Sequence, residues 1–352
     1  MNFGIALASA VDSWKHARRA EELGFTSSWF YDTQLLNPDI FICMALAAEK
    51  TSRIRLGTGV LIPSNRIEPV TANALATLNK IAPGRVDFGV GTGFTARRTM
   101  GLKPIPLRRM KKYVERVQEL LRGHLIEWEF EFENRKISFL NPDVGLINID
   151  DPIALHISAM GPKSRKLVAE MGAGWLNFGS DLKALVRDAE DFKSNWQTLQ
   201  GPETKMKNTL FFLGSVLGKD QEENAEKLML QAAPWTAVML HNLAESDARI
   251  YSKLPTKHRS VLEAYLNMYR GYKPSDAKYI ENHRGHLMYL REGEKKIIDP
   301  DFVRETTMSG SRQELRDKLL LLAESGYEDF VVQLIPGEEA AIEEWADVFS
   351  TL

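Results

Sequence analysis

The stretch RIRLGTGVLIPSNR, residues 53–66, interrupts a β-strand where an ordinary strand would continue. An apolar strand predicted over residues 53–58 runs into Gly57-Thr58-Gly59, and the apolar patch that follows soon stops at a proline. Glycine inside a strand marks a bulge or a close approach of the backbone to another group. The interruption therefore raises the question of what lies against the end of this strand.

The same strand is one of a regular series. Short apolar strands alternate with amphipathic helices along the chain, and such alternation predicts a parallel sheet. Eight strand–helix units predict that the sheet closes into a (β/α)8 TIM barrel. The predicted strands cover residues 2–7, 27–31, 53–58, 85–90, 153–159, 174–178, 209–217 and 330–334. The predicted helices cover residues 11–23, 39–49, 70–81, 107–122, 163–171, 182–196 and 338–349, and one more starts at residue 222.

Two stretches depart from this rhythm and are predicted to be insertions after strands 4 and 7. Residues 125–151 alternate like a β-hairpin, and residues 233–305 are rich in His, Tyr and Arg and are predicted to form a helical lid. No linker composition, repeat or low-complexity segment divides the chain. We therefore expect a single elaborated barrel domain over residues 1–352.

Composition narrows the class of protein. The net charge of −2 gives no bulk attraction to nucleic acid or to a membrane surface. The single cysteine, Cys43, excludes an intramolecular disulfide framework and a Cys-cluster metal site. The sequence begins without the basic and apolar pattern of a signal peptide, and no uncharged apolar run is long enough to cross a bilayer. These features predict a cytoplasmic protein.

Small and polar residues follow several of the predicted strands. Tyr31-Asp32-Thr33-Gln34 ends the second strand, and the fourth runs into GVGTGF, which includes Gly91 and Thr92. Glycine at these positions lets the backbone approach a flat or an anionic group. The spacing G-x-G-x-G is not the dinucleotide fingerprint, because no suitably placed acidic residue follows about 20 residues later.

The segment MGPKS after the fifth strand leads directly into a helix. Proline is favoured in the first turn, and the free N–H groups at a helix start can hold a phosphate. Lys163 or Ser164 can add to that site, and Arg97 and Arg98 could supply further charge. The alternative for MGPKS is an ordinary strand–helix turn, and the alternative for Arg97 and Arg98 is a solvated basic pair.

The predicted lid contains ENHRGHLMYL, in which His283 and His286 lie three residues apart. This spacing could suggest a metal, but no H-E-x-x-H pattern accompanies it, so we predict no metal site. A polar substrate pocket or a structural network is favoured instead. Cys43 is predicted to be a small core residue, and no nucleophile with an adjacent base is evident. A bound cofactor is therefore expected to supply the chemistry.

Four segments together resemble the bacterial luciferase-like flavin monooxygenases, most closely the branch that includes methylenetetrahydromethanopterin reductase. They are EELGFTSSWFYDTQ, LAAEKTSRIRLGTGVLIPSNRIEPVTANALATLNKIAPGRVDFGVGTG, ISAMGPKSRKLVAEMGAGWL and SGSRQELRDKLLLLAESGYEDFVV. The resemblance implies a (β/α)8 barrel that holds reduced FMN, or the deazaflavin coenzyme F-420, at the carboxyl ends of its strands.

Carried over residue by residue, the resemblance implies a flavin-binding set. GTGV matches a bulge behind the flavin ring, and several relatives have a cis peptide there, expected here between Gly59 and Val60. Many relatives follow the strand-2 acid with histidine, but this chain has Thr33. The implied cofactor-binding residues are Asp32, Thr58, Gly59, Val60, Gly91, Thr92, Arg98, Ala159, Gly161, Pro162 and Lys163.

The resemblance implies first a two-component monooxygenase. A separate reductase would supply reduced FMN, which would react with O2 to form a C4a-hydroperoxide that oxygenates a small organic substrate. His283, His286 and Gln34 are the catalytic candidates, and Thr33, Arg284 and Tyr289 are the substrate-binding candidates. A homodimer is expected from the family.

The alternative is a deazaflavin-dependent hydride-transfer oxidoreductase, whose cofactor carries an anionic tail. A basic groove for that tail could be formed by Arg97, Arg98, Lys103, Arg108, Arg109, Lys111 and Lys112. A flavin-binding barrel without catalytic activity is a third possibility, and turnover would separate it from the other two.

Overall fold

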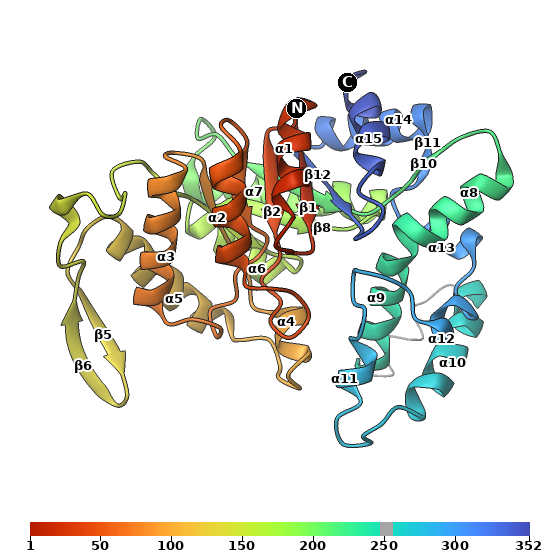
Figure 1. Cartoon of the computed structure of the whole chain (residues 1–352), viewed down its shortest axis with the longest axis horizontal. Coiled ribbons are helices and arrows are strands. Elements are labelled where there is room, and N and C mark those ends of the chain that lie inside the picture. The colour runs from red at the N-terminus through yellow and green to blue at the C-terminus, as the bar shows by residue number, and fades with distance from the viewer. Residues whose placement is uncertain (247–255) are drawn as a thin grey trace.

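The computed structural model describes residues 1–246 and 256–352, and eight parallel strands close into a barrel at its centre (Figure 1). The predicted (β/α)8 fold is therefore confirmed. Around the barrel the strands are β1 (Asn2–Leu7), β12 (Asp329–Leu334), β9 (Asn208–Phe212), β8 (Gly174–Phe178), β7 (Ala154–Ser158), β4 (Val86–Val90), β3 (Arg55–Thr58) and β2 (Ser27–Phe30).

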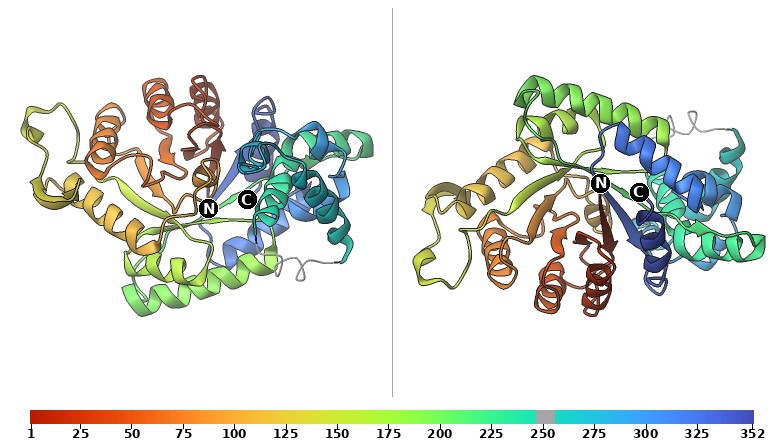
Figure 2. Two further views of the ribbon diagram at one scale, coloured as in Figure 1. Left: turned by 90° about the horizontal axis from the view of Figure 1, so that it is seen from below. Right: turned by 90° about the horizontal axis from the view of Figure 1, so that it is seen from above.

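Helices surround these strands (Figure 2). Each presents a buried stripe to the barrel, as the buried Ala17 and Ala20 of α1 illustrate. The stripes and the outer faces of the strands form the largest hydrophobic cluster. These helices are α1 (Trp14–Glu22), α2 (Ile40–Lys50), α3 (Glu68–Ile81), α5 (Leu107–Leu121), α6 (Pro162–Glu170), α7 (Leu182–Gln200), α14 (Arg312–Glu324) and α15 (Ala341–Phe349).

A second cluster fills the barrel interior and explains the first glycine of the interrupted strand. Trp29 points inward from β2 and packs edge-on against Phe211, with ring centroids 5.4 Å apart. A Cβ atom added at Gly57 would lie 2.3 Å from the Trp29 ring. Gly57 is therefore needed for packing, because only glycine leaves room for this indole.

The seventh predicted strand, residues 209–217, is shorter than expected. The barrel strand β9 ends at Phe212, and β10 (Val216–Leu217) pairs instead with β11 (Gly310–Ser311) outside the barrel. A Cβ atom at Gly214 would lie 1.9 Å from the carbonyl oxygen of Met308, so the two backbones touch there. After β9 the chain therefore leaves the barrel and runs beside residues 308–311.

The two insertions lie at opposite ends of the molecule (Figure 1). The first contains the antiparallel hairpin of β5 (Ile126–Phe130) and β6 (Glu133–Ile137), followed by the short η1 (Pro142–Val144). The second is helical and has its own hydrophobic cluster. Its elements and the helices leading into it are α8 (Gln221–Lys227), the π-helix η2 (Leu228–Ala232), α9 (Ala233–Ala244), α10 (Thr256–Arg270), α11 (Tyr279–Asn282), α12 (Glu292–Lys295) and α13 (Pro300–Thr306).

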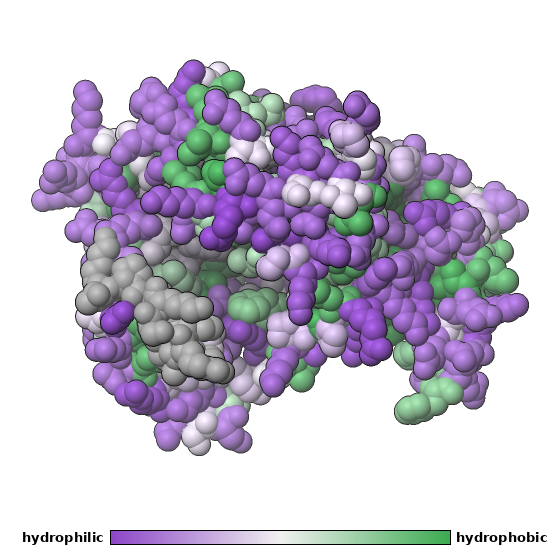
Figure 3. Space-filling view, turned by 180° about the vertical axis from the view of Figure 1, so that it is seen from behind, coloured by the Kyte–Doolittle hydropathy of each residue, from purple (hydrophilic) through white to green (hydrophobic). Residues whose placement is uncertain are grey.

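The face of the molecule seen in Figure 3 is mainly hydrophilic, with smaller hydrophobic patches between hydrophilic side chains. Within the described ranges, no helix combines the length and the apolar character that a membrane span requires.

Candidate active site at the carboxyl ends of the strands

The peptide bond between Gly59 and Val60 is cis, as the family resemblance implies. Beyond it, Leu61 rejoins the barrel through a bridge to Val90. Val60 is half-buried and packs on the interior cluster. A Cβ atom at Gly91, on the next strand end, would lie 2.7 Å from Val60 Cγ2. Gly91 therefore lets the two strand ends meet, because a side chain there would collide with Val60.

Asp32 fixes the segment that follows this bulge. Its buried carboxylate accepts hydrogen bonds from the Ile62 backbone N–H at 3.1 Å and from Asn65 Nδ2 at 3.2 Å. Arg66 donates to both carboxylate oxygens at 3.0 and 3.1 Å. With these donors in place, Asp32 acts on the region around Val60 by positioning the chain of residues 61–66.

Two other predicted residues are held by neighbouring backbone. Gln34 Nε2 donates to the Ala96 carbonyl at 2.6 Å, and its Oε1 accepts from Asn65. The Thr58 hydroxyl donates to the Gly89 carbonyl at 2.6 Å and accepts from the Gly89 N–H at 2.9 Å. Thr58 is fully buried, so its side chain links β3 to β4.

The phosphate-side residues lie together at the start of α6. Gly161 is the N-cap, Pro162 occupies the first turn, and Lys163 is exposed. Ser164 Oγ accepts from the Gly161 N–H at 3.2 Å and donates to its carbonyl at 2.8 Å. Ala159 is buried, and its carbonyl accepts from Trp175 Nε1. The helix start thus offers backbone N–H groups and the exposed Lys163 side chain, and both can bind an anion.

Arg98 is predicted to bind the phosphate, but the structure directs its guanidinium to the helical insertion. Its NH1 donates to Asn242 Oδ1 at 2.9 Å, and its Nε lies 3.8 Å from Glu245 Oε2. The guanidinium also stacks 3.7 Å from the centre of the Phe94 ring. Arg98 therefore joins α4 (Phe94–Arg98) to α9. The Thr92 carbonyl nearby accepts from Ile105.

Among the remaining members of the basic groove, Arg97 donates from Nε to the Lys103 carbonyl, and the other five divide into two groups. Lys111 and Lys112 form ion pairs with Glu115 and Glu129. Lys103, Arg108 and Arg109 are exposed and have no ion pair with any described residue. Because α5 begins at the carboxyl ends of the strands, the arginines stand near the rim of the barrel mouth.

A turn of the insertion, residues 283–289, lies over the barrel mouth. The Leu287 carbonyl accepts from Gln333 Nε2 at 3.1 Å at the end of β12, and Leu287 has a positive φ of 59°. Met288 Sδ accepts from Asn37 Nδ2 at 3.6 Å. Leu287 and Met288 pack on the same interior cluster as Val60. Arg284 and Tyr289 of this turn are exposed. The turn therefore covers one side of the region that Val60 faces.

Three buried histidines meet here, His283 and His286 from this turn and His241 from α9. His286 Nδ1 lies 3.3 Å from His241 Nδ1 and 3.3 Å from His283 Nδ1, and His286 Nε2 lies 3.1 Å from Thr95 Oγ1. His241 Nε2 lies 2.7 Å from Glu294 Oε1, and His283 Nε2 lies 3.0 Å from Glu245 Oε1. Sequence analysis missed His241, Glu245, Glu294 and Thr95. His241 lies on an apolar helix, where a buried histidine could have been noted, but its partners His286 and Glu294 are 45 and 53 residues distant.

The charges in this cluster follow from burial. Burial lowers the pKa of His286 well below its usual range, and His241, His283 and Arg98 lower it further. Burial also lowers the pKa of His241, although Glu294 opposes it. His286 is therefore neutral at pH 7, a state that suits a ligand or hydrogen-bonding role better than the predicted role of proton donor.

The two glutamates of the cluster are charged. Burial raises the pKa of the Glu294 carboxyl, but His241 and Arg291 outweigh burial, and the net pKa lies below the usual range. Burial acts in the same way on Glu245, and its contacts with His283, Asn282 and Arg98 lower its pKa overall. The cluster thus combines neutral imidazoles with two carboxylates.

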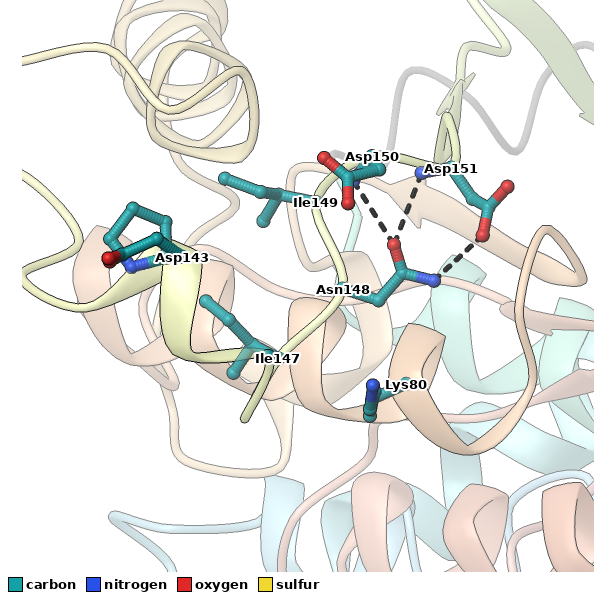
Figure 4. A pocket seen from close by; sticks show the side chains of 9 residues that line it. Lys80, Asp143, Ile147, Asn148, Ile149, Asp150 and Asp151 are labelled. Carbon is teal, nitrogen blue, oxygen red and sulfur yellow. Dashed lines mark hydrogen bonds between the residues drawn. The ribbon is translucent and has the colours of Figure 1, made fainter.

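Two hollows lie away from this region. One, of about 470 Å³, is lined by Lys80 and residues 142–151, where Asn148 bonds to Asp150 and Asp151 (Figure 4). The other, of about 200 Å³, lies at the amino ends of the strands beside Arg55 and Asp87. Barrel enzymes carry out their chemistry at the opposite, carboxyl end, so both hollows are read as structural.

The model of the luciferase-like monooxygenase family matches residues 7–329. The chain belongs to this family. The match runs from the last residue of β1 to the first residue of β12, and it includes the carboxyl ends of β2, β3, β4 and β7.

Two curated proteins are similar to the chain in sequence. The chain is 28% identical over 262 residues to a 5,10-methylenetetrahydromethanopterin reductase of Archaeoglobus fulgidus, covering 70% of this chain and 75% of the relative. It is 30% identical over 173 residues to an F-420-dependent glucose-6-phosphate dehydrogenase of Kineococcus radiotolerans. That second match covers 46% of this chain and about half, 50%, of the relative.

Solved structures of the luciferase-like family share the fold. The F-420-dependent tetrahydromethanopterin reductase of Methanopyrus kandleri superposes with a TM-score of 0.72 at 20% identity, covering 98% of this chain and 97% of that one. The oxygenating component of 3,6-diketocamphane monooxygenase from Pseudomonas putida, solved with FMN, has a TM-score of 0.65 at 14% identity. It covers 97% of this chain and 96% of that one. This chain is an oxidoreductase of the family, and a flavin-type cofactor is supported.

Proposed function

We propose that this protein is a deazaflavin-dependent oxidoreductase that transfers a hydride between coenzyme F-420 and a small organic substrate at the carboxyl ends of its strands. The observation that carries the proposal is the set of sequence relatives described as F-420-dependent, among them the glucose-6-phosphate dehydrogenase of Kineococcus radiotolerans. The exposed Lys103, Arg108 and Arg109 support it, because an oligoanionic cofactor tail requires cations at the rim.

The residues at the mouth fit such a cofactor. Gly91 carries no side chain beside Val60, so the half-buried Val60 can form a surface for a flat ring. The start of α6 would hold the phosphate through the N–H groups of its first turn and through Lys163. When bound, the deazaflavin would supply a carbon centre that accepts or donates a hydride.

The chain's own residues would orient and enclose the reactants. Asp32 holds residues 61–66, so that Val60 presents a fixed surface. Leu287 and Met288 would exclude water from the reacting atoms, and Thr33, Arg284 and Tyr289 would contact the substrate. Gln34, anchored by Ala96 and Asn65, would hold the strand-2 end in place.

A second candidate is the FMN-dependent monooxygenase. Thr33 favours it, because the histidine that many F-420-dependent relatives carry after the strand-2 acid is missing here. The shared fold accommodates either cofactor. In that case a separate reductase would deliver reduced FMN, and the apolar cover of Leu287 and Met288 would protect the oxygen chemistry from water.

An anaerobic turnover screen separates the two. Reduced F-420 is mixed with carbonyl and imine substrates, and oxidised F-420 with secondary alcohols and sugar phosphates, while the deazaflavin absorbance is followed. The proposal expects a change that depends on enzyme and substrate. Oxygen uptake with reduced FMN and a substrate, and no deazaflavin turnover, would instead establish the monooxygenase.

Lys163→Ala tests where the cofactor phosphate lies. A charged hydrogen bond contributes about 1.5–3 kcal/mol, so the variant should bind F-420 or FMN about 10- to 100-fold more weakly. Riboflavin, which lacks a phosphate, should bind unchanged, as measured by fluorescence titration. Lys166→Ala, an exposed lysine farther along α6, is the matched control and should bind all three normally. Equal weakening of riboflavin would place the phosphate elsewhere.

A further inference from the structure

We propose that His241, His283 and His286 bind one divalent transition-metal ion, with the geometry best suited to Zn²⁺, and that this ion joins α9 to the turn over the barrel mouth. The site does not depend on which cofactor the barrel binds. It would replace the prediction that the chain has no metal site, because the third histidine is brought in by the fold from α9.

The spacing of the ring nitrogens matches a metal ligand set. Two imidazole nitrogens bound at about 2.0–2.1 Å to a tetrahedral Zn²⁺ lie about 3.3–3.4 Å apart. The Nδ1 atom of His286 lies 3.3 Å from that of His241 and 3.3 Å from that of His283. One ring nitrogen from each of the three residues lies within 4.8 Å of the others.

Protons alone do not satisfy this arrangement. A charged carboxylate accepts only, so Glu294 requires an N–H at His241 Nε2, and Glu245 favours one at His283 Nε2. Both of these histidines then present an Nδ1 lone pair to His286, whose single Nδ1 proton cannot satisfy two acceptors fully. A cation at the centre would accept all three lone pairs.

The surroundings have the form of a metal second shell. Metal-bound histidines commonly donate their other N–H to a carboxylate, a carbonyl or water. Here Glu294 stands behind His241, Glu245 behind His283 and the Thr95 hydroxyl behind His286.

The elements that carry the ligands explain what the ion would do. His241 lies on α9, His283 and His286 lie in the turn over the barrel mouth, and Thr95 lies on α4 after β4. One ion would fix α9 to the turn, and the hydrogen bond between Thr95 and His286 would connect both to α4. Three protein ligands would leave a fourth position for water or another small ligand.

Metal analysis of the tag-free full chain tests the proposal. The protein is stripped with a chelator, loaded with Zn²⁺ and dialysed, and its zinc content is measured by elemental mass spectrometry. We expect one zinc per chain and a higher melting temperature than for the stripped protein. Loading with Co²⁺ should give the visible absorption bands of a tetrahedral nitrogen site, which is a readout on the unaltered sequence.

Variants then locate the site. His241→Ala and His286→Ala should lose the bound metal, while His258→Ala, a histidine of α10 outside the cluster, should retain it. Glu294→Gln keeps the shape of the second shell and should weaken Zn²⁺ binding about 10- to 100-fold. If the unaltered protein retained no zinc and gave no Co²⁺ spectrum, or if His241→Ala retained as much zinc as the unaltered protein, the proposal would be overturned.

Discussion

Asp32→Ala is expected to lose about 100-fold in cofactor-dependent turnover, because small displacements of a positioning segment cost rates of that order. It should also lower the free energy of unfolding by about 3 kcal/mol, since removing one partner of a buried ion pair leaves the other uncompensated. Arg66, Asn65 and the Ile62 N–H would each lose an acceptor. Steady-state kinetics and urea denaturation measure the two effects.

Two further variants serve as controls for Asp32→Ala. Asp32→Asn keeps an acceptor oxygen and should recover part of the stability. Asp12→Ala removes an exposed carboxylate whose partner, Lys15, lies 3.6 Å away, and should change stability by less than about 0.5 kcal/mol. Wild-type turnover by Asp32→Ala would show that residues 61–66 do not support the reaction.

Asp87→Ala is expected to lower the free energy of unfolding by about 3–5 kcal/mol. Asp87 is 1% exposed at the foot of the barrel and accepts two hydrogen bonds of 2.8 Å from Arg55. His156 Nε2 lies 3.2 Å from the same carboxylate. Alanine would leave both partners facing a cavity, and chemical denaturation measures the loss. Wild-type stability in this variant would contradict the assignment.

The same residue predicts a pH dependence. Burial raises the pKa of Asp87, but His156 and Arg55 outweigh burial and hold it far below the ordinary value of 3.8. The carboxylate therefore contributes its full stabilisation above that ordinary value, and the contribution falls as the pH drops below it. The difference in stability between the natural protein and Asp87→Asn should be constant from pH 7 to about pH 5 and shrink in more acidic solution.

The barrel could be predicted from the sequence because each unit is local. Alternating apolar strands and amphipathic helices identified all eight barrel strands, and the 125–151 stretch forms the hairpin that its alternation indicates. The end of the seventh strand was misplaced because Gly214 meets Met308, a contact between segments about 90 residues apart. No local pattern contains that contact.

The candidate site likewise has a part that could be predicted from the sequence and a part that could not. Residues on one strand end, such as Gly59 and Val60 with their cis peptide, follow from the interrupted strand and the family resemblance. The partners of Arg98 and the meeting of His241 with His286 depend on how the insertion folds back over the mouth. Those contacts join elements that are far apart in the sequence, and no local periodic pattern predicts them.

The interrupted strand thus has two explanations, one at each of its two glycines. Gly57 leaves room for Trp29 inside the barrel, and Gly59 begins the cis peptide whose Val60 side chain faces the proposed cofactor. The central claim is that this cofactor is the deazaflavin.

Equilibrium titration of the purified protein with coenzyme F-420 and with FMN, each in its oxidised and reduced form, tests that claim most directly. The account predicts saturable F-420 binding at least about tenfold tighter than FMN binding, a difference of about 1.4 kcal/mol. Arg108→Ala with Arg109→Ala should reduce the preference by weakening F-420 alone. Tighter binding of reduced FMN than of F-420 would contradict the account and favour the monooxygenase.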